Sequence, residues 1–401
     1  MKIRKGYKKT EIGRIPEKWE VVRLGEVLSL EYGRGLTKNE RENGEYPVYG
    51  SNGVIGYHSQ YLIKGPGIIV GRKGSIGAIT WSDRNFWPID TTYYILLRKS
   101  EIDPRWLFYK LSSLNLDRLN MATGTPGLNR DLVYKLKLPL PPLPEQRKIA
   151  EILSTVDKAI EKVDEAIEKT ERLKKGLMQN LLTNGIGHKE FKDTEIGRIP
   201  KEWEVVRLGD PEISEAIYYG ITAKACSYKT GLKMLRTTDI KNFVFDYHKL
   251  PYCKITDTRN QISQYKLFEG DIIVARAGTV GVSVLVDRDY EDVVFGSYLI
   301  KVKPKKEEIY PKYIHYFFQS YMYWSHIKKA QGSTLKNINL PLLKSLILPL
   351  PPLPEQKKIA EILSTVDKRL ELLKNKKEKL KRIKKGLMND LLTGRRRVKV
   401  K

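Results

Sequence analysis

The sequence predicts an α+β protein in which two mixed α/β domains are separated by two long antiparallel coiled-coil helices, with internal pseudo-two-fold symmetry. First, LPLPPLPEQRKIAEILSTVDKAIEK at residues 138–162 recurs as LPLPPLPEQKKIAEILSTVDKRLEL at residues 348–372, with 21 of 25 positions identical. Second, apolar residues inside each copy follow the heptad spacing of a coiled coil. Third, each copy is preceded by a region that reads as strand, glycine turn and strand.

Two further repeats show that the whole chain is duplicated. TEIGRIPEKWEVVRLGE at residues 10–26 recurs as TEIGRIPKEWEVVRLGD at residues 194–210, a shift of 184. LKKGLMQNLLTNG at residues 173–185 is matched by IKKGLMNDLLTG at residues 383–394, a shift of 210. The chain is therefore two copies of one unit, 1–184 and 185–401, and the second copy holds about 26 extra residues before its helix.

The mixed region of each copy contains recognisable short elements. GIIVGRKGSIGAITW at residues 67–81 and DIIVARAGTVGVSVL at residues 271–285 predict hairpins whose glycines take positive φ. DPRWLFYKLSS at residues 103–113 and YPKYIHYFFQS at residues 310–320 predict short helices that begin with proline in the first turn.

The last part of each copy predicts one long helix that begins at Pro144 or Pro354 and ends near Gly185 or Gly394. The first spans about 57 Å if helical from residue 145 to 182. The predicted seam consists of Ile149, Leu153, Val156, Ile160, Val163 and Ile167 in the first helix and Ile359, Leu363, Val366, Leu370 and Leu373 in the second, which lapses at Lys377. The predicted boundaries are a domain at 1–143, a helix at 144–184, a domain at 185–353, a helix at 354–394 and a basic tail at 395–401.

The direction of the two helices follows from the connection between them. The second mixed domain starts where the first helix ends and finishes where the second begins, and a compact domain of this size has a radius of gyration near 15 Å. Its ends cannot easily lie 57 Å apart, so we expect an antiparallel pair within one chain. The alternative is that each seam pairs with a second chain in a homodimer.

The charge of the chain indicates a polyanionic partner. There are 73 Lys and Arg against 47 Asp and Glu, a formal net charge of +26. Nucleic acid is the leading candidate and a membrane surface the alternative. We find no run of about 18 apolar residues and no signal peptide pattern, so we expect a cytoplasmic protein. The only cysteines, Cys226 and Cys253, do not predict a metal site, although His248 lies five residues before Cys253.

With these repeats in view, the chain resembles the specificity (S) subunit of a type I restriction-modification system. The residues that carry the resemblance are the paired LPLPPLPEQ(R/K)KIAEIL segments, the TEIGRIP openings and the GDIIVARAGTVG hairpin, and it covers residues 10–394. It implies that each mixed domain is a target-recognition domain reading one half of a bipartite double-stranded DNA site with an unspecified gap. It also implies that the helices are spacers that dock methyltransferase (M) subunits, and that restriction (R) subunits join afterwards. A 57 Å spacer compares with about 17 base pairs.

Candidate DNA-binding residues come from the hairpin tips, the loops before the proline segments and the divergent regions. They are Lys38, Arg72, Lys73, Asn129, Arg130, Lys224, Lys229, Lys233, Arg236, Arg276, Lys336 and Asn337. Arginine and lysine contact phosphates and guanine edges, and asparagine suits adenine. Each also has a structural interpretation, as a solvated turn, a loop cap or an exposed surface cation. Between the divergent regions only a Tyr-Gly pair and a lysine correspond, at residues 32, 33 and 38 and at 219, 220 and 224.

Three other motifs favour structure over chemistry. GRKGSIG at residues 71–77 lacks the GK-Ser/Thr and following helix of a phosphate-binding loop. The tyrosine-rich residues 313–324 could stack on bases but have the spacing of a helix core. LPLPPLPEQ could be a proline ligand, but a stiff lead-in to the helix explains it. The 145–182 helix holds eight acidic and eight basic residues, which suits protein docking better than a phosphate groove.

No catalytic motif is recognised, so we expect no enzymatic activity from this chain alone. We expect no cofactor on it; S-adenosylmethionine, ATP and Mg²⁺ would be bound by the partner subunits, as the resemblance implies. Two other functions stay open. One is a self-contained nuclease, which would cut plasmid without partners. The other is a coiled-coil scaffold that binds DNA by charge alone, without sequence preference. The sequence does not give the half-sites or the gap length.

Overall fold

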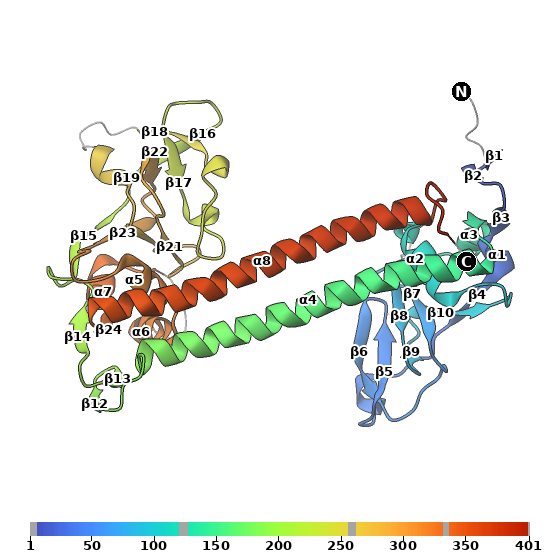
Figure 1. Ribbon diagram of the computed structural model, residues 1–401, viewed down its shortest axis with the longest axis horizontal. Helices are drawn as coiled ribbons and strands as arrows, with labels where there is room; N and C mark the ends of the chain where they lie inside the picture. Colours follow the sequence, from blue (N-terminus) through green and yellow to red (C-terminus); the bar gives the residue numbers. More distant parts are fainter. Residues whose placement is uncertain (1–5, 120–126, 256–261, 332–336, 400–401) are drawn as a thin grey trace. The chain divides into compact units, whose positions relative to one another are not determined.

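In a computed structural model of the chain, the structure describes residues 6–119, 127–255, 262–331 and 337–399 (Figure 1). The chain divides into two compact units, residues 1–165 with 374–401 and residues 166–373. Each unit contains one mixed domain and parts of both long helices. We call them unit 1 and unit 2.

Unit 1 is built from small sheets that are antiparallel except for the parallel pairing of β5 with β9. The strands are β1 (Tyr7–Thr10), β2 (Gly13–Pro16), β3 (Glu20–Arg23), β4 (Leu28–Tyr32), β5 (Tyr46–Gly50), β6 (Gly53–His58), β7 (Gly67–Gly71), β8 (Ile79–Ser82), β9 (Trp87–Pro88), β10 (Thr92–Leu97) and β11 (Lys137–Leu140). The main sheet has the order β4-β10-β7-β8, and a smaller sheet has the order β6-β5-β9. The short helices are α1 (Leu24–Val27), η1 (Lys38–Glu40), α2 (Pro104–Ser112), η2 (Leu116–Leu119) and α3 (Arg130–Lys135).

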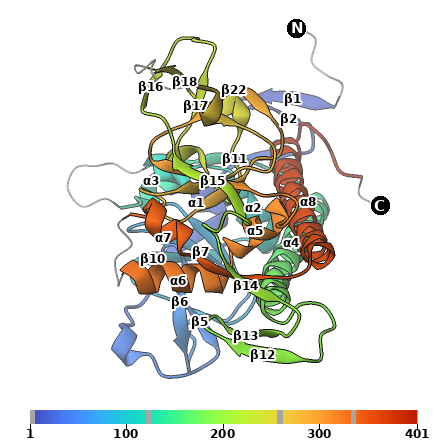
Figure 2. The ribbon, with the colours of Figure 1, turned by 90° about the vertical axis from the view of Figure 1, so that its left-hand side faces the viewer.

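Unit 2 repeats this plan with an enlarged second sheet. The strands are β12 (Phe191–Thr194), β13 (Gly197–Pro200), β14 (Glu204–Arg207), β15 (Ser214–Tyr219), β16 (Ala223–Cys226), β17 (Lys233–Leu235), β18 (Tyr252–Ile255), β19 (Lys266–Leu267), β20 (Ile272–Ala275), β21 (Ser283–Leu285), β22 (Tyr290–Phe295), β23 (Leu299–Pro304) and β24 (Ile347–Leu350). The main sheet, β15-β23-β20-β21, matches that of unit 1. The second sheet has the order β16-β18-β17-β22-β19, and strands β16, β17, β18 and β22 lie at the top of Figure 2. The helices are α5 (Pro311–Phe317), α6 (Tyr321–Gln331) and α7 (Leu340–Lys344), with the 3-10 turns η3 (Thr237–Asp239), η4 (Tyr247–Lys249) and η5 (Ile262–Tyr265).

The predicted hairpins are confirmed in both units. β7 pairs antiparallel with β8 and β20 with β21. Gly74 and Gly77 have φ of +75° and +72°, and Gly278 and Gly281 have +75° and +85°. Only glycine adopts this backbone without strain, which explains why both copies carry it at the same places.

Helices α4 (Leu143–Thr183) and α8 (Leu353–Leu391) begin one residue before the predicted prolines. Gly185 and Gly394 follow them with φ of +66° and +72°, as helix stop signals do. The pairing is within the chain and antiparallel, as predicted. In unit 1, Asp157 of α4 lies 2.6 Å from Lys384 near the end of α8, and in unit 2, Asp367 of α8 lies 2.7 Å from Lys174 near the end of α4.

None of the eleven residues of the predicted seam is exposed. Ile149 and Leu153 share a core with Leu391 and Leu392 in unit 1, and Ile359 and Leu363 share one with Leu181 and Leu182 in unit 2. The lapse at Lys377 is also explained, because its ammonium lies 2.5 Å from Asp164 of α4.

The repeated Pro-Glu-Gln sequence has a structural role. Gln146 accepts a 2.8 Å hydrogen bond from the backbone N–H of Asp103, the N-cap of α2, and donates to the carbonyl groups of Glu101 and Pro141. Gln356 makes the equivalent bonds to Tyr310, Glu308 and Pro351 in unit 2. This glutamine therefore fastens each mixed domain to the start of its own long helix.

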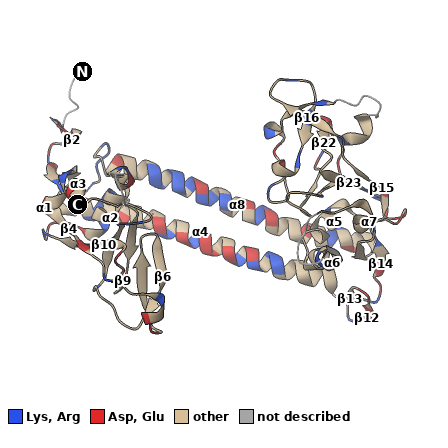
Figure 3. Cartoon of the chain, turned by 180° about the vertical axis from the view of Figure 1, so that it is seen from behind, with Lys and Arg blue, Asp and Glu red and all other residues tan. Residues whose placement is uncertain are grey.

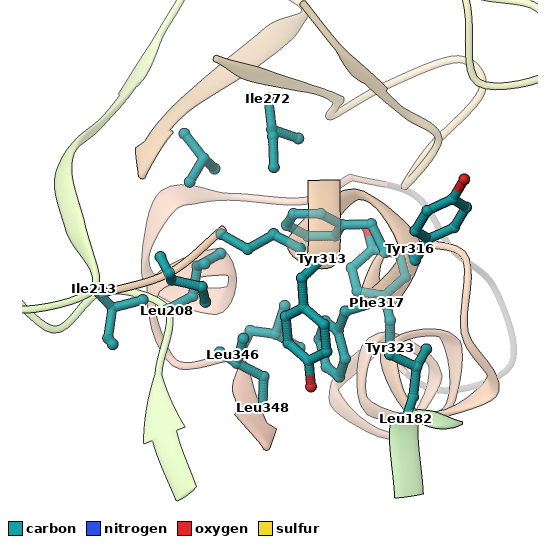
Figure 4. Packing of buried hydrophobic residues seen from close by; sticks show 14 of the residues in the cluster. Leu182, Leu208, Ile213, Ile272, Tyr313, Tyr316, Phe317, Tyr323, Leu346 and Leu348 are labelled. Atoms are coloured by element: carbon teal, nitrogen blue, oxygen red, sulfur yellow. The ribbon is translucent and has the colours of Figure 1, made fainter. Parts of the chain in front are cut away.

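The tyrosine-rich segment of unit 2 is mostly core, as its helical spacing indicates. Tyr313, Phe317 and Tyr323 are fully buried in one cluster with Leu346 and Leu348 (Figure 4). Tyr321 is the exception, with 79% of its surface exposed.

Candidate nucleic-acid interface

Unit 1 gathers two arginines around one exposed tyrosine. Tyr32 ends β4 and Arg72 follows β7, and both strands pair with β10, so the sheet brings the two side chains together. The guanidinium of Arg72 lies 5.1 Å from the Tyr32 ring centre and 6.0 Å from that of Tyr93. Arg130, the first residue of α3, lies 5.3 Å from the same Tyr32 ring. These are cation–π distances, so the tyrosine holds two cations at the end of the sheet.

Backbone bonds fix the position of Arg72. Its N–H donates to the carbonyl of Thr91 at 2.9 Å, and its guanidinium donates to the carbonyl of Asp90 at 2.7 and 3.1 Å. Its own carbonyl accepts a 2.9 Å bond from the N–H of Leu128, which anchors the loop that carries Arg130. The predicted hairpin and the predicted loop therefore meet in one site.

Unit 2 repeats the site with a different neighbour. Arg276 lies 4.3 Å from the Tyr219 ring centre, and its Nε donates a 3.2 Å bond to the side-chain oxygen of Asn337. Its backbone N–H donates to Tyr298, and its carbonyl accepts from Ile338 at 2.9 Å. The two arginines and two tyrosines occupy equivalent places, while Arg130 in one unit and Asn337 in the other give each site its own chemistry.

The glycine that follows each tyrosine is required by close backbone packing. A Cβ on Gly33 would lie 2.1 Å from the carbonyl oxygen of Ile89, and one on Gly220 would lie 2.2 Å from that of Gly296. This contact places the tyrosine beside the arginine, and it explains why a Tyr-Gly pair is shared by otherwise divergent regions.

The tyrosines were missed as site residues by the sequence reasoning. Tyr32 exposes 51% of its surface, and Tyr219 is half-buried. Burial, followed by its hydrogen bond with Tyr32, raises the pKa of Tyr93 to about 12, so this phenol stays neutral and the arginines set the charge of the site. The signal that could have found them is the shared Tyr-Gly pair.

Of the remaining predicted residues, some are exposed on the surface and one caps a helix. Lys38, Lys73, Lys224 and Lys229 are exposed. Lys336 lies outside the described residues. Asn129 is the N-cap of α3, where its side-chain oxygen accepts from the N–H groups of Asp131 and Leu132. Its counterpart is Asn339, the N-cap of α7.

Lys233 and Arg236 are engaged inside unit 2. Lys233 is 9% exposed, lies 3.8 Å from the Tyr247 ring centre and donates to the Tyr247 carbonyl at 3.0 Å. Arg236 makes two bonds of 2.9 and 2.8 Å to the carboxylate of Asp239, and its hydrogen bonding to Asp239 raises its pKa. Both side chains therefore have partners within unit 2.

Most of the chain matches a known family model and known relatives. The family model described as the type I restriction modification DNA specificity domain matches residues 16–171 and 200–382. The specificity subunit of the type I restriction enzyme MjaVIII from Methanocaldococcus jannaschii is 31% identical over 414 residues, covering 96% of this chain and 95% of that protein. The EcoKI specificity subunit from Escherichia coli is 24% identical and covers 88% of this chain and 82% of that one.

Solved structures show the same fold. The S subunit of a type I restriction-modification system from M. genitalium superposes with a TM-score of 0.65 at 18% identity, covering 98% of both chains. A second structure, from a study of complex assembly and conformational transition in a type I system, gives a TM-score of 0.58 at 18% identity, with 95% of this chain and 99% of that chain covered.

Two related mixed domains, joined through paired helices, define a specificity subunit with two recognition domains. This chain belongs to the family of type I restriction-modification DNA specificity subunits. In the described part of the chain, no helix is long and apolar enough to cross a lipid bilayer.

Proposed function

We propose that each mixed domain reads one half of a bipartite double-stranded DNA target, and that the two halves differ and are separated by an unspecified gap. The observation that carries this proposal is the pair of arginine–tyrosine sites at equivalent places. Arginine can contact a guanine edge or a phosphate, and the exposed Tyr32 of unit 1 also offers a flat face. A shared Arg–Tyr pair with unlike neighbours is what two readers of different sequences need.

The helices would dock methyltransferase (M) subunits, and restriction (R) subunits would then join the complex. Helix α4 has balanced charges, whereas α8 carries eight Lys and Arg against two Asp and Glu between residues 374 and 391 (Figure 3). Partner binding along α8 should therefore depend more on salt than partner binding along α4. In this proposal S-adenosylmethionine, ATP and Mg²⁺ act on the partners, and this chain contributes recognition rather than catalysis.

The experiment is reconstitution of methylation with the cognate M subunit, followed by mapping of modified sites on a DNA library. A two-part motif with a fixed gap is expected. Replacing the region of unit 2 that contains Arg276 and Asn337 with that of another family member should change one half of the motif and leave the other intact. A single uninterrupted motif, or none, would overturn the proposal.

Two controls test the alternative functions, which are a self-contained nuclease and DNA binding by charge alone. Purified chain with Mg²⁺ and plasmid tests a self-contained nuclease, which would cut without partners. Competition with random DNA over a salt series tests binding by charge alone, which would show a salt slope but no preferred sequence.

Insertion of one heptad in both helices, about 10 Å, should change the tolerated gap between the two half-sites.

A further inference from the structure

Unit 1 contains a pocket of about 740 Å³ whose lining includes four cations and no carboxylate. The cations come from four separate segments: Arg14 from β2, Lys110 from α2, Lys137 from β11 and Arg395 from the residues after α8. Lys137 has a partner, because its ammonium lies 2.5 Å from Glu11. The three other cations have no ion pair with any residue that the structure describes.

Lys110 is the unusual member of this group. Only 6% of its surface is exposed, and its Nζ donates one hydrogen bond, of 3.2 Å, to the carbonyl of Leu392 at the end of α8. A lysine ammonium has three donors, so two are left without an acceptor among the residues that the structure describes, and Lys110 lines the pocket. Burial lowers its pKa to about 8, which reflects the cost of holding a charge there without a counter-ion.

Unit 2 shows that the fold does not need this lysine. Phe317 follows Tyr316 in α5 as Lys110 follows Tyr109 in α2, and Phe317 is fully buried. The equivalent pocket is smaller, about 410 Å³, and Arg198 is the only arginine or lysine in its lining. The cationic pocket is therefore a feature added to unit 1 and not a requirement of the repeated architecture.

The geometry points to a binding site for a phosphate or polyphosphate group in this pocket. Lys110 would donate from the floor, and Arg14 and Arg395, which are both exposed, would donate from the rim. Charge-assisted bonds from a buried ammonium and two guanidinium groups suit a doubly or triply charged oxyanion. The pocket volume lies within the range of small-molecule sites. This site is distinct from the arginine–tyrosine sites and does not rest on the proposed reading of DNA.

The same phosphate chemistry could come from a free polyphosphate or from the end of a nucleic-acid strand. The probe is pyrophosphate, titrated into the full chain by calorimetry at an ionic strength held constant with potassium chloride. Wild type is expected to bind it. Lys110→Phe copies the residue of unit 2 and is expected to weaken binding at least ten-fold, as is Arg14→Gln combined with Arg395→Gln. Arg198→Gln, the equivalent change in unit 2, is the matched control and should bind as wild type does.

The outcomes are separable. Absence of pyrophosphate binding to wild type, or equal binding by wild type and Lys110→Phe, would overturn the site. Circular dichroism establishes that each variant is folded, and Lys110→Met provides a second test at the same position. Competition by a 5′-phosphorylated duplex, but not by the same duplex with a 5′-hydroxyl, would assign the phosphate to a nucleic-acid end. Pyrophosphate binding that neither duplex competes with would assign the site to a free anion.

Discussion

The indole N–H of Trp19 donates a 3.0 Å hydrogen bond to the carboxylate of Glu145, at the start of α4 and 126 residues further along the chain. Trp203 makes the equivalent 2.9 Å bond to Glu355 at the start of α8. The residue that completes each site differs. Arg397, from the tail after α8, contacts Glu145, and His188, from the segment after α4, lies 2.9 Å from Glu355. The predicted basic tail is thus, at Arg397, part of the fold of unit 1.

Removal of this carboxylate should destabilise the unit that holds it. Glu145→Ala leaves a buried indole N–H and the Arg397 guanidinium without their acceptor, so we expect a loss of about 2–3 kcal/mol. Glu355→Ala should have a similar effect in unit 2. Urea unfolding of the full chain, monitored by tryptophan fluorescence, measures the stability loss of both variants. Glu151→Ala, which removes an exposed carboxylate paired with Lys148, is the control and should change stability by less than about 0.5 kcal/mol. Equal effects of Glu145→Ala and Glu151→Ala would contradict this interpretation.

The second prediction concerns a triad that joins each domain to both helices. Tyr109 donates a 2.7 Å bond to Asp157, which pairs with Lys384, and Tyr316 donates a 2.9 Å bond to Asp367, which pairs with Lys174. Because these charges are partly exposed, we expect Asp157→Asn to cost only about 1 kcal/mol. A double-mutant cycle with Lys384→Met should show coupling of a few tenths of a kcal/mol or more.

The control for that cycle is Lys381→Met, since Lys381 pairs with Glu378 of its own helix. Coupling between Asp157 and Lys381 as large as that between Asp157 and Lys384 would show that the helices are not joined by this pair.

The third prediction concerns a buried ion pair in unit 2. Lys301 and Asp271 are 1% and 2% exposed in their side chains, and their charged atoms lie 2.7 Å apart. Lys301→Met should cost about 3–5 kcal/mol because it leaves a buried carboxylate uncompensated. The double variant with Asp271→Leu should recover much of this loss. Thermal and urea unfolding test it, with Lys303→Met at the half-exposed pair with Glu215 as the control. A double variant no more stable than Lys301→Met would argue against a charge effect.

The fourth prediction tests the arginine–tyrosine sites. Arg72→Ala should reduce methylation at one half-site by about ten- to a hundred-fold, the value of a good arginine contact, and Arg276→Ala should affect the other half. The measurement is the methylation motif produced with the M subunit. Arg98, which follows β10 at the end away from Thr92 and stacks on Tyr134, gives the control Arg98→Ala. A uniform loss of binding for all sequences would instead assign the arginines to phosphate contacts.

The fifth prediction is a pH effect of Lys110. Its folded-state pKa of about 8 lies below the ordinary value of 10.5. Between these values the unfolded chain binds the proton and the folded chain does not, so this lysine makes stability rise with pH over that window. At pH 7 the charge is buried at a cost, and Lys110→Met should be more stable by roughly 1–3 kcal/mol. This advantage should shrink toward pH 10, as measured by urea midpoints without phosphate. A variant less stable than wild type at pH 7 would contradict it.

Much of the fold could be predicted because its signals are local or repeated. The seam from Ile149 to Ile167, the glycines of the two hairpins and the prolines at the helix starts each depend on neighbours within a few residues. The antiparallel arrangement followed from chain connectivity. The candidate DNA-binding residues stay predictions. The fold does place Arg72 and Arg130 beside the ring of Tyr32, and Arg276 beside the ring of Tyr219.

The remainder could not be predicted because it depends on residues far apart in the chain. A lysine such as Lys233 is usually found on the surface, but here the ring of Tyr247, from a different turn, packs against its ammonium group. Asn129 and Asn337 look equivalent in the sequence, yet Asn129 caps a helix and corresponds to Asn339.

By itself, the sequence determined the duplication, the hairpins, the paired helices and the family of this protein. The reason is that periodicity and turn chemistry act over short distances and occur in both copies of the repeat. Tertiary structure alone decided which charges are free and which are buried. Arg397 reaches Glu145, and Lys110 lies beneath the end of α8, only because antiparallel helices return the last residues of the chain to the first domain.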